Sequence, residues 1–477
     1  MFESWYASRR TPESAALLDR IREAGRSEAR AAAQRLVAVG ELFAARLRDS
    51  GEQADSAIDT SDAVAAQVGA ALQCSIAMAS SYLRYATALR DRLPKVGKAF
   101  QAGDIDYRAF QTVVFRTDLI TDADVLAQVD VLLAVRLSQC PSLTRGRLAA
   151  EVDRVVAKAD PDGVRRAKEV FRDRFLDVDT AETGMAFVTG TVLATAGRAL
   201  DHRLDELAGT VCDDDPRSRE QRRADALGAL AGGADRLVCG CGSSGCNVAA
   251  RACRSNVVIH VVADQASVDG NGKTPGVVLG AQGLIPADMV AELVKNARLQ
   301  PLTPPVDVPE PRYAPSAKLA DFVRARDLTC RAPGCDCPAV TCDLDHTVAY
   351  RDGGPTHASN LKALCRKHHL LKTFGGWRDK QLPDGTVIWL LPDRRSYVTT
   401  PGSALLFPNL CAPTGDLPPT SLTPVSQCGS REMLMPTRTR TRRQGRAQRV
   451  EAERRQNRRL RVAAKAAPTH DTAPPPF

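Results

Sequence analysis

The sequence predicts a mainly α-helical N-terminal domain, a small Cys- and His-rich C-terminal module and a disordered basic tail. Through residues 1–230, apolar side chains recur at steps of three and four, which is the period of helices that bury one face. Six prolines between Pro301 and Pro315 then mark a stiff linker and a domain boundary. Between Cys330 and Thr373 lie four of the seven histidines and five of the fourteen cysteines. A chain of 477 residues, 44% of them apolar, has enough material for two or three such units.

The helical domain is expected to span residues 1–298, with short connections between its helices. Residues 64–93 carry a regular apolar stripe, which predicts one long amphipathic helix that Pro94 ends. Asp160-Pro161-Asp162-Gly163 is a strong turn signal between helical blocks. Further stripes cover residues 15–47, 124–135 and 185–207, the last interrupted by Thr189-Gly190-Thr191-Val192, which favours a strand or a turn.

The character of the sequence changes near residues 239–253, which form a Gly-, Ser- and Cys-rich loop. The spacing of Cys239, Cys241 and Cys246 suits zinc, with Cys253 or His260 as the fourth ligand. A C-x-C pair is strained as a chelate, so free thiols are the alternative for this loop. The elements expected downstream are a strand over 257–262, a helix over 286–298, the linker over 299–315 and a helix over 316–327.

Positive charge is concentrated in the tail. Residues 431–465 contain twelve Arg and one Lys against three Glu, a net charge of +10, whereas the whole chain carries +9 and its remainder therefore sums to −1. Residues 411–477 are dominated by Pro, Thr, Ser and Arg, which predicts disorder with at most a transient helix near 446–465. Such a tail either binds phosphate nonspecifically and in a salt-dependent way, or stays solvated without a partner.

The sequence lacks the signals of export and of membrane insertion. No run of eighteen apolar residues occurs, and the N-terminal residues lack the apolar core of a secretory signal, so a cytoplasmic location is expected. In that compartment the cysteines are expected to be reduced, buried or metal-bound, because disulfides are rare there.

Four residues of the Cys- and His-rich segment have the spacing of a structural zinc site. Cys330 and Cys335 form one pair, while Cys365 and His368, expected on one face of a helix, form the other. Such an ion would hold together a unit that is too small to be stable through apolar burial alone. The alternatives are that Cys337 replaces Cys335, that Cys342 is a further ligand, or that these cysteines are simply buried.

Asp345, His346 and His369 are expected to have a different task. On a helix, His369 is turned by about 100° from its neighbour His368, away from the zinc and toward the short strand expected at Thr341-Cys342-Asp343-Leu344, directly before Asp345. An Asp and a His that meet there can hold one hard divalent cation and leave positions open for water and phosphate. His346 is then free to act as a general base, because imidazole titrates near neutral pH. The alternative is a structural histidine bonded to the backbone.

Asn360 precedes Leu361, where the helix of this segment is expected to start. Asparagine at such a position is ordinarily an N-cap. The second interpretation is that the side-chain amide ties back the loop formed at Gly353-Gly354 and thereby orients His346.

Together these residues resemble the HNH endonuclease motif in its zinc-stapled form. The likeness rests on Asp345-His346, Asn360 and His369, framed by Cys330, Cys335, Cys365 and His368. Two departures are the Cys-x-x-His second zinc pair, where many members have Cys-x-x-Cys, and Ala349, where many have proline. The resemblance implies a ββα-metal module of two strands and a helix over 316–376. A β-hairpin extension over 377–410, turning at Pro383-Asp384-Gly385, is expected to follow.

The resemblance also implies a function, that of a metal-dependent DNA endonuclease. Mg²⁺ or Mn²⁺ would lie between Asp345 and His369, and His346 would take a proton from the attacking water. Four cations expected on the same helix would contact DNA phosphates or form an ordinary solvated face, namely Lys362, Arg366, Lys367 and Lys372. The alternative is a catalytically inactive zinc-stapled DNA-binding protein of mobile-element origin. The presence of all four motif residues favours the enzyme.

Over residues 60–408 the chain resembles the actinobacterial 13E12 repeat family, in which a helical domain of unknown function (DUF222) precedes an HNH module. The stretches that carry this likeness are Arg92-Leu93-Pro94, Asp160-Pro161-Asp162, 222–227, 258–264 and 373–377. The resemblance implies no role for the helical domain.

Overall fold

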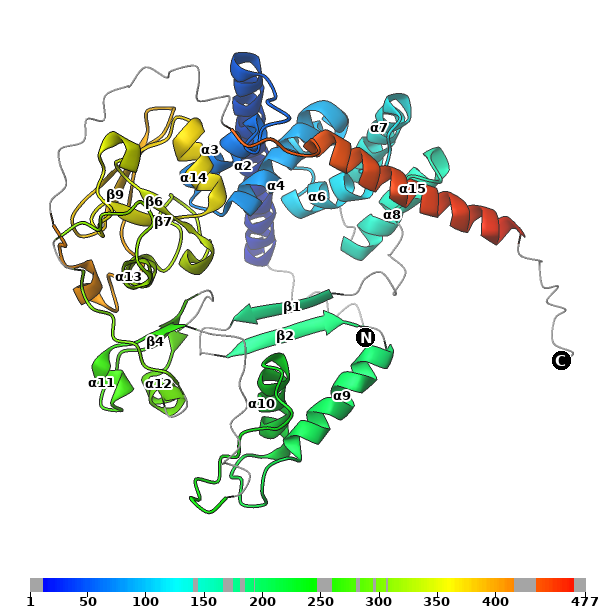
Figure 1. Cartoon of the computed structure of the whole chain (residues 1–477). Coiled ribbons are helices and arrows are strands. Elements are labelled where there is room, and N and C mark those ends of the chain that lie inside the picture. The colour runs from blue at the N-terminus through cyan, green and yellow to red at the C-terminus, as the bar shows by residue number, and fades with distance from the viewer. Residues whose placement is uncertain are drawn as a thin grey trace, which may run out of the picture.

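The computed structural model describes residues 12–139, 145–165, 175–180, 185–192, 194–246, 260–279, 284–294, 297–305, 308–415 and 435–466. A bundle of helices forms the N-terminal body, and the Cys- and His-rich module lies beside it (Figure 1). The last helix of the chain crosses the body away from that module, and two smaller units lie below (Figure 1).

The helices of the N-terminal body meet in one apolar core. Leu36, Phe100 and Leu133 come from three different helices and are almost fully buried in it. The helices expected over 15–47 and 124–135 are confirmed as α2 and α7. The helices of the body are α2 (Pro12–Ser50), α3 (Thr60–Leu72), α4 (Ile76–Thr87), the π-helical turn η1 (Ala88–Arg92), α5 (Pro94–Ala102), α6 (Tyr107–Arg116), α7 (Ala123–Gln139) and α8 (Arg145–Ala159).

The single long helix expected over residues 64–93 is wrong, because the chain turns sharply between α3 and α4. Gln73 adopts a left-handed conformation with φ of 52° and ends α3 by donating its N–H to the Gly69 carbonyl. Ser75 then starts α4 by accepting a hydrogen bond from the Met78 N–H. The apolar spacing continues through this turn, because both helices bury a face in the same part of the protein, and the period alone therefore concealed the break.

In the described part of the chain, no single helix has both the length and the apolar composition of a membrane span. The stretches Thr60–Leu72 and Ile76–Arg92 pass that test only as a pair, and the pair is bent by 111°.

In the sequence between the body and the Cys- and His-rich module, the described residues form short strands and four helices. The strand expected at residues 189–192 is present in β2 at Ala186–Thr191, and the helix expected over 286–298 is present as α12. Of the strand expected over 257–262, residues 257–259 lie outside the described residues, and β3 covers Val261–Val262 without His260. The elements are the antiparallel pair β1 (Phe175–Thr180) and β2, then α9 (Ala194–Ala208), α10 (Arg219–Ala231), β3 (Val261–Val262), α11 (Gln265–Val268), β4 (Gly276–Val278), β5 (Leu284–Ile285) and α12 (Ala287–Val294).

The Cys- and His-rich module contains two antiparallel strands followed by a helix, and then a second sheet. Strand β6 pairs with β7 so that Asp345 lies opposite Lys362 and His346 lies opposite Leu361. The extension over 377–410 is a three-stranded sheet in the order β10-β9-β8, not the single hairpin expected, although the expected turn at Pro383-Asp384-Gly385 joins β8 to β9. The elements are α13 (Ala317–Asp327), η2 (Ala339–Thr341), β6 (Asp343–His346), η3 (Tyr350–Asp352), β7 (Leu361–Leu364), α14 (Arg366–Phe374), β8 (Arg378–Gln381), β9 (Val387–Leu390), β10 (Ser396–Thr399) and η4 (Pro408–Cys411).

The module packs directly on α3 of the helical body. Ile58, Ala66 and Ala70 share one buried cluster with the module's Cys330 and Trp389. At Gly334 a side chain is impossible, because a Cβ atom there would lie 2.7 Å from the Gly69 carbonyl oxygen. The module and α3 therefore form one closely packed interface.

The end of the Pro-rich segment belongs to the module rather than to a free linker. The Glu310 N–H donates to the Thr356 carbonyl at 2.9 Å, and the Glu310 carboxylate accepts from Ser316 at the start of α13. The domain boundary therefore lies earlier than residue 315.

The prediction of a disordered tail does not hold for residues 435–466, which include α15 (Arg442–Ala466). Guanidinium groups of this segment pair with carboxylates of the helical body, as Arg454 does with Asp160 and Arg461 with Asp162. The buried Asn457 side chain also donates to the Asp162 and Val164 carbonyls. Composition predicted disorder because the segment has little apolar surface to bury. Ion pairs with residues remote in sequence, rather than apolar burial, hold this segment against the helical body.

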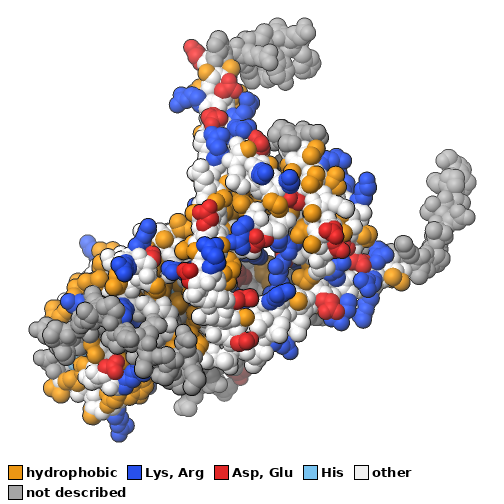
Figure 2. Space-filling model, turned by 90° about the horizontal axis from the view of Figure 1, so that it is seen from above, with side chains coloured by type: hydrophobic (Ala, Val, Ile, Leu, Met, Phe, Trp, Pro, Cys, Tyr) orange, Lys and Arg blue, Asp and Glu red, His pale blue; other side chains and the backbone are white. Residues whose placement is uncertain are grey.

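The pairing of the tail with the body affects the distribution of surface charge. On the face seen in Figure 2, Lys and Arg side chains are interspersed with Asp and Glu rather than gathered in one basic field. The net charge of +10 in the tail is thus partly matched within the molecule.

Candidate functional site

Cys330, Cys335, Cys365 and His368 converge, as the sequence predicts. Their ligand atoms all lie within 4.8 Å of one another, and the Cys365 and Cys330 sulfurs lie 3.3 and 3.6 Å from His368 Nδ1. Cys365 is the N-cap of α14 and His368 follows one turn later, so the helix itself places this pair. Tetrahedral zinc with Zn–S bonds of about 2.3 Å has ligand–ligand edges of about 3.8 Å, so three thiolates and an imidazole spaced in this way can hold zinc.

The two spare cysteines do not join this cluster. The Cys337 sulfur lies 3.4 Å from the Thr341 hydroxyl, and the Cys342 sulfur lies 3.3 Å from the Pro338 carbonyl. Cys335 therefore occupies the position for which the sequence left Cys337 as an alternative.

Asp345 and His369 also meet. The Nε2 atom of His369 lies 3.5 Å from Oδ1 of Asp345, and its Nδ1 atom lies 2.8 Å from Oδ2 of Asp343. When Asp343 accepts the Nδ1 proton, the Nε2 lone pair faces the Asp345 carboxylate, and two electron-rich atoms then face each other. A carboxylate behind a ligating imidazole is the usual arrangement of metal-bound histidines, so these residues fit a hard divalent ion.

Asp343 was missed by the sequence reasoning. It precedes Asp345 by two positions on β6, and side chains two apart on a strand project from the same face. The Asp-x-Asp spacing on a strand was therefore the sequence pattern that could have identified Asp343.

The other oxygen of Asp345 is held by two lysines. Lys362 and Lys372 approach Oδ2 at 2.5 and 2.6 Å, and both also pair with Asp379. Burial opposes ionisation of Asp345, but the two ammonium groups outweigh it and lower its pKa to about 2. Asp345 is therefore a carboxylate at neutral pH.

This arrangement corrects two expectations about the cations of the segment. Lys362 lies on β7 rather than on the helix, and its side chain is fully buried. Lys372 lies on α14, but its ammonium group is bonded to Asp345 and to the His346 and Thr347 carbonyls instead of being free for phosphate. Asp379, which completes the cluster, lies on β8 and hence beyond the module boundary expected at residue 376.

Arg366 and Lys367 are exposed on α14 but already have partners. Arg366 lies 3.2 Å from Asp343, and Lys367 lies 3.3 Å from Asp62 of the helical body. Phosphate binding by these two residues remains a prediction.

His346, at the end of β6, is buried among aromatic rings. Its ring stacks on Tyr313 at a centroid distance of 5.2 Å and meets the edge of Tyr350. Its Nε2 atom lies 2.9 Å from the Thr356 hydroxyl oxygen. Burial lowers the pKa of His346, while the nearby Asp345 carboxylate opposes this shift. The hydrogen-bond partner of His346 is thus the Thr356 side chain and not the backbone. With its pKa lowered, the imidazole is neutral at physiological pH.

The tautomer of His346 follows from its neighbours. The Thr356 hydroxyl donates to the Tyr313 carbonyl at 3.4 Å, so its oxygen accepts from His346 Nε2–H. The lone pair is then on Nδ1. Tyr313 was missed by the sequence reasoning because it was assigned to the linker.

Asn360 is not a helix N-cap, because Leu361–Leu364 is a strand and Cys365 caps α14 instead. Its buried amide accepts from the Val348 N–H at 2.8 Å and donates to the Val348 and Pro355 carbonyls. The loop between β6 and β7 is clipped to itself in this way, as the second interpretation of the sequence expected. Gly354 is required in this loop, since a Cβ atom there would lie 1.9 Å from the Val348 carbonyl oxygen.

Comparison with known proteins places the chain among mycobacterial relatives. It is 43% identical over 473 residues to the uncharacterized protein Rv3776 of Mycobacterium tuberculosis, covering 93% of this chain and 90% of that one. It is 42% identical over 487 residues to the uncharacterized protein Rv2100 of the same organism, covering 93% and 88%. No solved structure matches the chain.

A family model described as "Domain of unknown function (DUF222)" matches residues 23–327. The match covers the helical body and ends with α13, so Cys330 and the residues after it lie beyond it. The chain therefore belongs to the DUF222 family.

Proposed function

We propose that this protein is a metal-dependent DNA endonuclease of the HNH type. The observation that carries the proposal is the pair of facing ligand atoms, His369 Nε2 and Asp345 Oδ1, with Asp343 behind the imidazole. Strand β6, strand β7 and helix α14 support this pair, and the candidate zinc ligands anchor the helix. The resemblance of Asp345-His346, Asn360 and His369 to the HNH motif supplies the reaction class.

A bound Mg²⁺ or Mn²⁺ would stabilise the negative charge that develops on the phosphate and on the leaving oxygen. Asp345 and His369 would hold it, with Asp345 kept ionised by its lysine neighbours. His346 would take the proton of the attacking water on Nδ1, since Nε2–H is committed to Thr356. Asn360 would act as a positioning residue, because it fixes the loop that follows His346.

The charges around Asp345 determine how the cation would bind. Asp343, Asp345 and Asp379 are matched by Lys362, Lys372 and Arg366, so the formal charge of the group is zero. A divalent ion therefore meets no net attraction until a DNA phosphate arrives with negative charge and a further oxygen ligand. We expect the ion to bind more tightly in the presence of DNA than in its absence.

The same observation favours a second candidate, a zinc-stapled DNA-binding protein without turnover. In that protein, Lys362 and Lys372 would be the permanent partners of Asp345 and would replace the divalent ion. Calorimetric titration with Mn²⁺ and a noncleavable DNA duplex separates the candidates. Binding that Asp345→Asn abolishes supports the enzyme, and salt-dependent DNA binding without Mn²⁺ uptake supports the alternative.

The deciding experiment is cleavage of supercoiled plasmid with Mg²⁺ or Mn²⁺. Wild type is compared with His346→Ala and with His260→Ala, an exposed histidine outside the module, at matched zinc content. Nicked or linear product from wild type and His260→Ala, but not from His346→Ala, supports the proposal. Equal cleavage by all three removes His346 as the base. DNA binding without product from any of them favours the alternative.

A further inference from the structure

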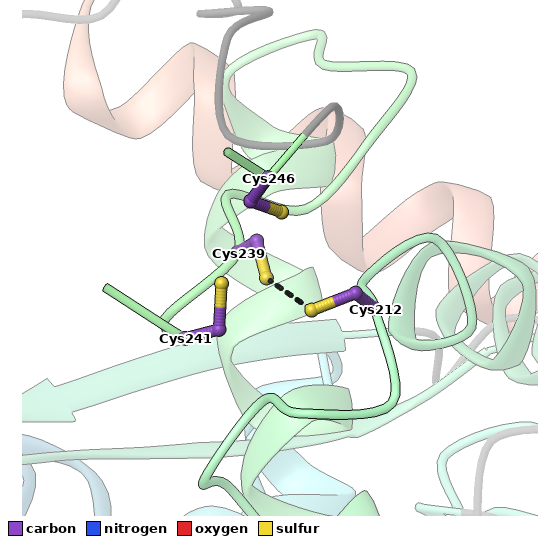
Figure 3. Close-up of side chains that lie close together, drawn as sticks. All are labelled: Cys212, Cys239, Cys241 and Cys246. Carbon is purple, nitrogen blue, oxygen red and sulfur yellow. Dashed lines mark hydrogen bonds between the residues drawn. The ribbon is translucent and has the colours of Figure 1, made fainter. Parts of the chain in front are cut away.

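A second group of four cysteines lies outside the Cys- and His-rich module. Cys212 follows α9, and Cys239, Cys241 and Cys246 follow α10. Their sulfurs point toward one another (Figure 3) and all lie within 4.8 Å of each other. We propose that these four thiolates bind one zinc ion as a structural site, independently of the proposed function.

The spacing of the sulfurs suits a metal ion better than disulfides. Cys212 and Cys239 sulfurs lie 3.4 Å apart, near the edge of about 3.8 Å expected for tetrahedral Zn–S ligation. A disulfide needs about 2.05 Å, and all four thiols are free. Four soft thiolates this close together select zinc, with iron as the other metal of this ligand class.

Cys212 occupies the fourth position, for which the sequence suggested Cys253 or His260. It lies 27 residues before Cys239, across the whole of α10, and only the fold brings it to the loop. Cys253 lies outside the described residues. Gly242 directly follows the Cys239-Gly240-Cys241 pair and has a φ of 68° that side chains rarely adopt, so the turn after this pair requires glycine.

The loops that carry the cysteines are fixed by polar contacts from both sides of α10. The Asp215 carboxylate, whose side chain is fully buried, accepts from the Gly240 N–H at 2.7 Å and from Arg217. Arg217 in turn donates to the Val238 carbonyl, and the Leu237 N–H donates to the Thr210 hydroxyl at 2.8 Å. The backbone around Cys239 is thus held against the loop that contains Cys212.

A metal ion would supply the stability that the α9–α10 unit does not obtain from apolar burial. Few of its apolar side chains are buried, among them Leu207, Ala226 and Leu237. The ion pairs between the helices, such as Arg219 with Asp205, are exposed and stabilise little. A unit with so small a core is typically held together by metal or disulfides.

The test is the zinc content of the full chain, measured by mass spectrometry after exhaustive dialysis under reducing conditions. We expect two zinc ions in wild type and one in Cys212→Ser, Cys241→Ser or Cys365→Ser. We expect none in Cys212→Ser/Cys365→Ser, and two in the control variants Cys74→Ser and Cys253→Ser. Retention of both ions by Cys212→Ser, or loss of one by Cys253→Ser, overturns the ligand set.

Two further measurements keep the proposal refutable where a variant fails to fold. Cobalt substitution of Cys365→Ser should give the sulfur-to-cobalt charge-transfer band of a four-thiolate site. Amide exchange of residues 194–246 in wild type should rise severalfold when the metal is chelated. A single zinc ion in wild type that Cys212→Ser retains, or a disulfide among these four cysteines in the reduced preparation, contradicts the proposal.

Discussion

Replacing Lys362 with methionine tests whether the buried charges around Asp345 stabilise the module. Methionine keeps most of the apolar stem but removes the ammonium group that lies 2.5 Å from both Asp345 and Asp379. Two buried carboxylates then share Lys372 alone, and loss of one partner from a buried ion pair costs about 3–5 kcal/mol. The lysine also lies 5.8 Å from the Trp389 ring centroid, but a cation–π contact contributes only about 0.5–2 kcal/mol, so the charge pairs dominate.

Urea unfolding followed by tryptophan fluorescence measures this cost. Trp377 and Trp389 are both buried in the module and report on it directly. With an m-value of about 2 kcal/mol/M, the module's midpoint should fall by roughly 1.5–2.5 M. Lys318→Met, at an exposed lysine of α13, is the matched control and should change the free energy of unfolding by less than about 0.5 kcal/mol.

The double variant Lys362→Met/Asp379→Asn decides the physical cause. It removes one positive and one negative charge, so Asp345 and Lys372 remain as a balanced pair. The double variant should therefore be more stable than Lys362→Met. If it is less stable than the single variant, or if Lys362→Met unfolds like the control, charge balance does not account for the stability of this cluster.

Three more outcomes are expected. Asp62→Asn removes a buried partner of Arg438 and Arg442, so trypsin should cut within α15 about tenfold faster than in wild type. The control Asp19→Asn, at an exposed site, should be cut at the wild-type rate, and equal cleavage rates in the two variants would contradict the docking of α15 on the body. Burial lowers the folded-state pKa of His346 below about 6.5, so the neutral imidazole contributes its full stability above pH 6.5, and this stability is lost as the pH falls through the folded-state pKa. An NMR titration of His346 with a midpoint at or above 6.5 would contradict this. Cys335→Ser should lower the zinc content by one ion while Cys337→Ser leaves it unchanged, and the reverse result would reassign the ligand.

Local patterns predicted the elements and ligand pairs that depend on short-range geometry. The stripe of α2, the pairing of Cys365 with His368 and the turn of His369 toward β6 follow from helical periodicity alone. The approach of His369 to Asp345 needed only one further assumption, that the strand lies beside the helix.

What the sequence did not reveal depends on contacts between residues far apart in the chain. Lys362 was expected on a helix, facing either phosphate or solvent, because its partner Asp379 is 17 residues later, beyond an intervening helix and on a different sheet. Tyr313 seemed to be linker because nothing near it indicates that it stacks on His346. Cys212 has no local motif at all, and only the packing of α9 against α10 brings it to the other three cysteines.

The docking of the tail also has a consequence for the order in which the protein is made. Asp59 leaves the ribosome 379 residues before Arg438, its partner in the folded chain. At about 5–20 residues per second, this separation corresponds to roughly 20–75 s of synthesis. Throughout that interval Arg438 and Arg442 are not yet available to the carboxylates of Asp59 and Asp62, which are almost fully covered in the finished protein. The helical body is therefore synthesised well before its two arginine partners, and of the residues that pair with Asp62, Lys367 of the module is translated first.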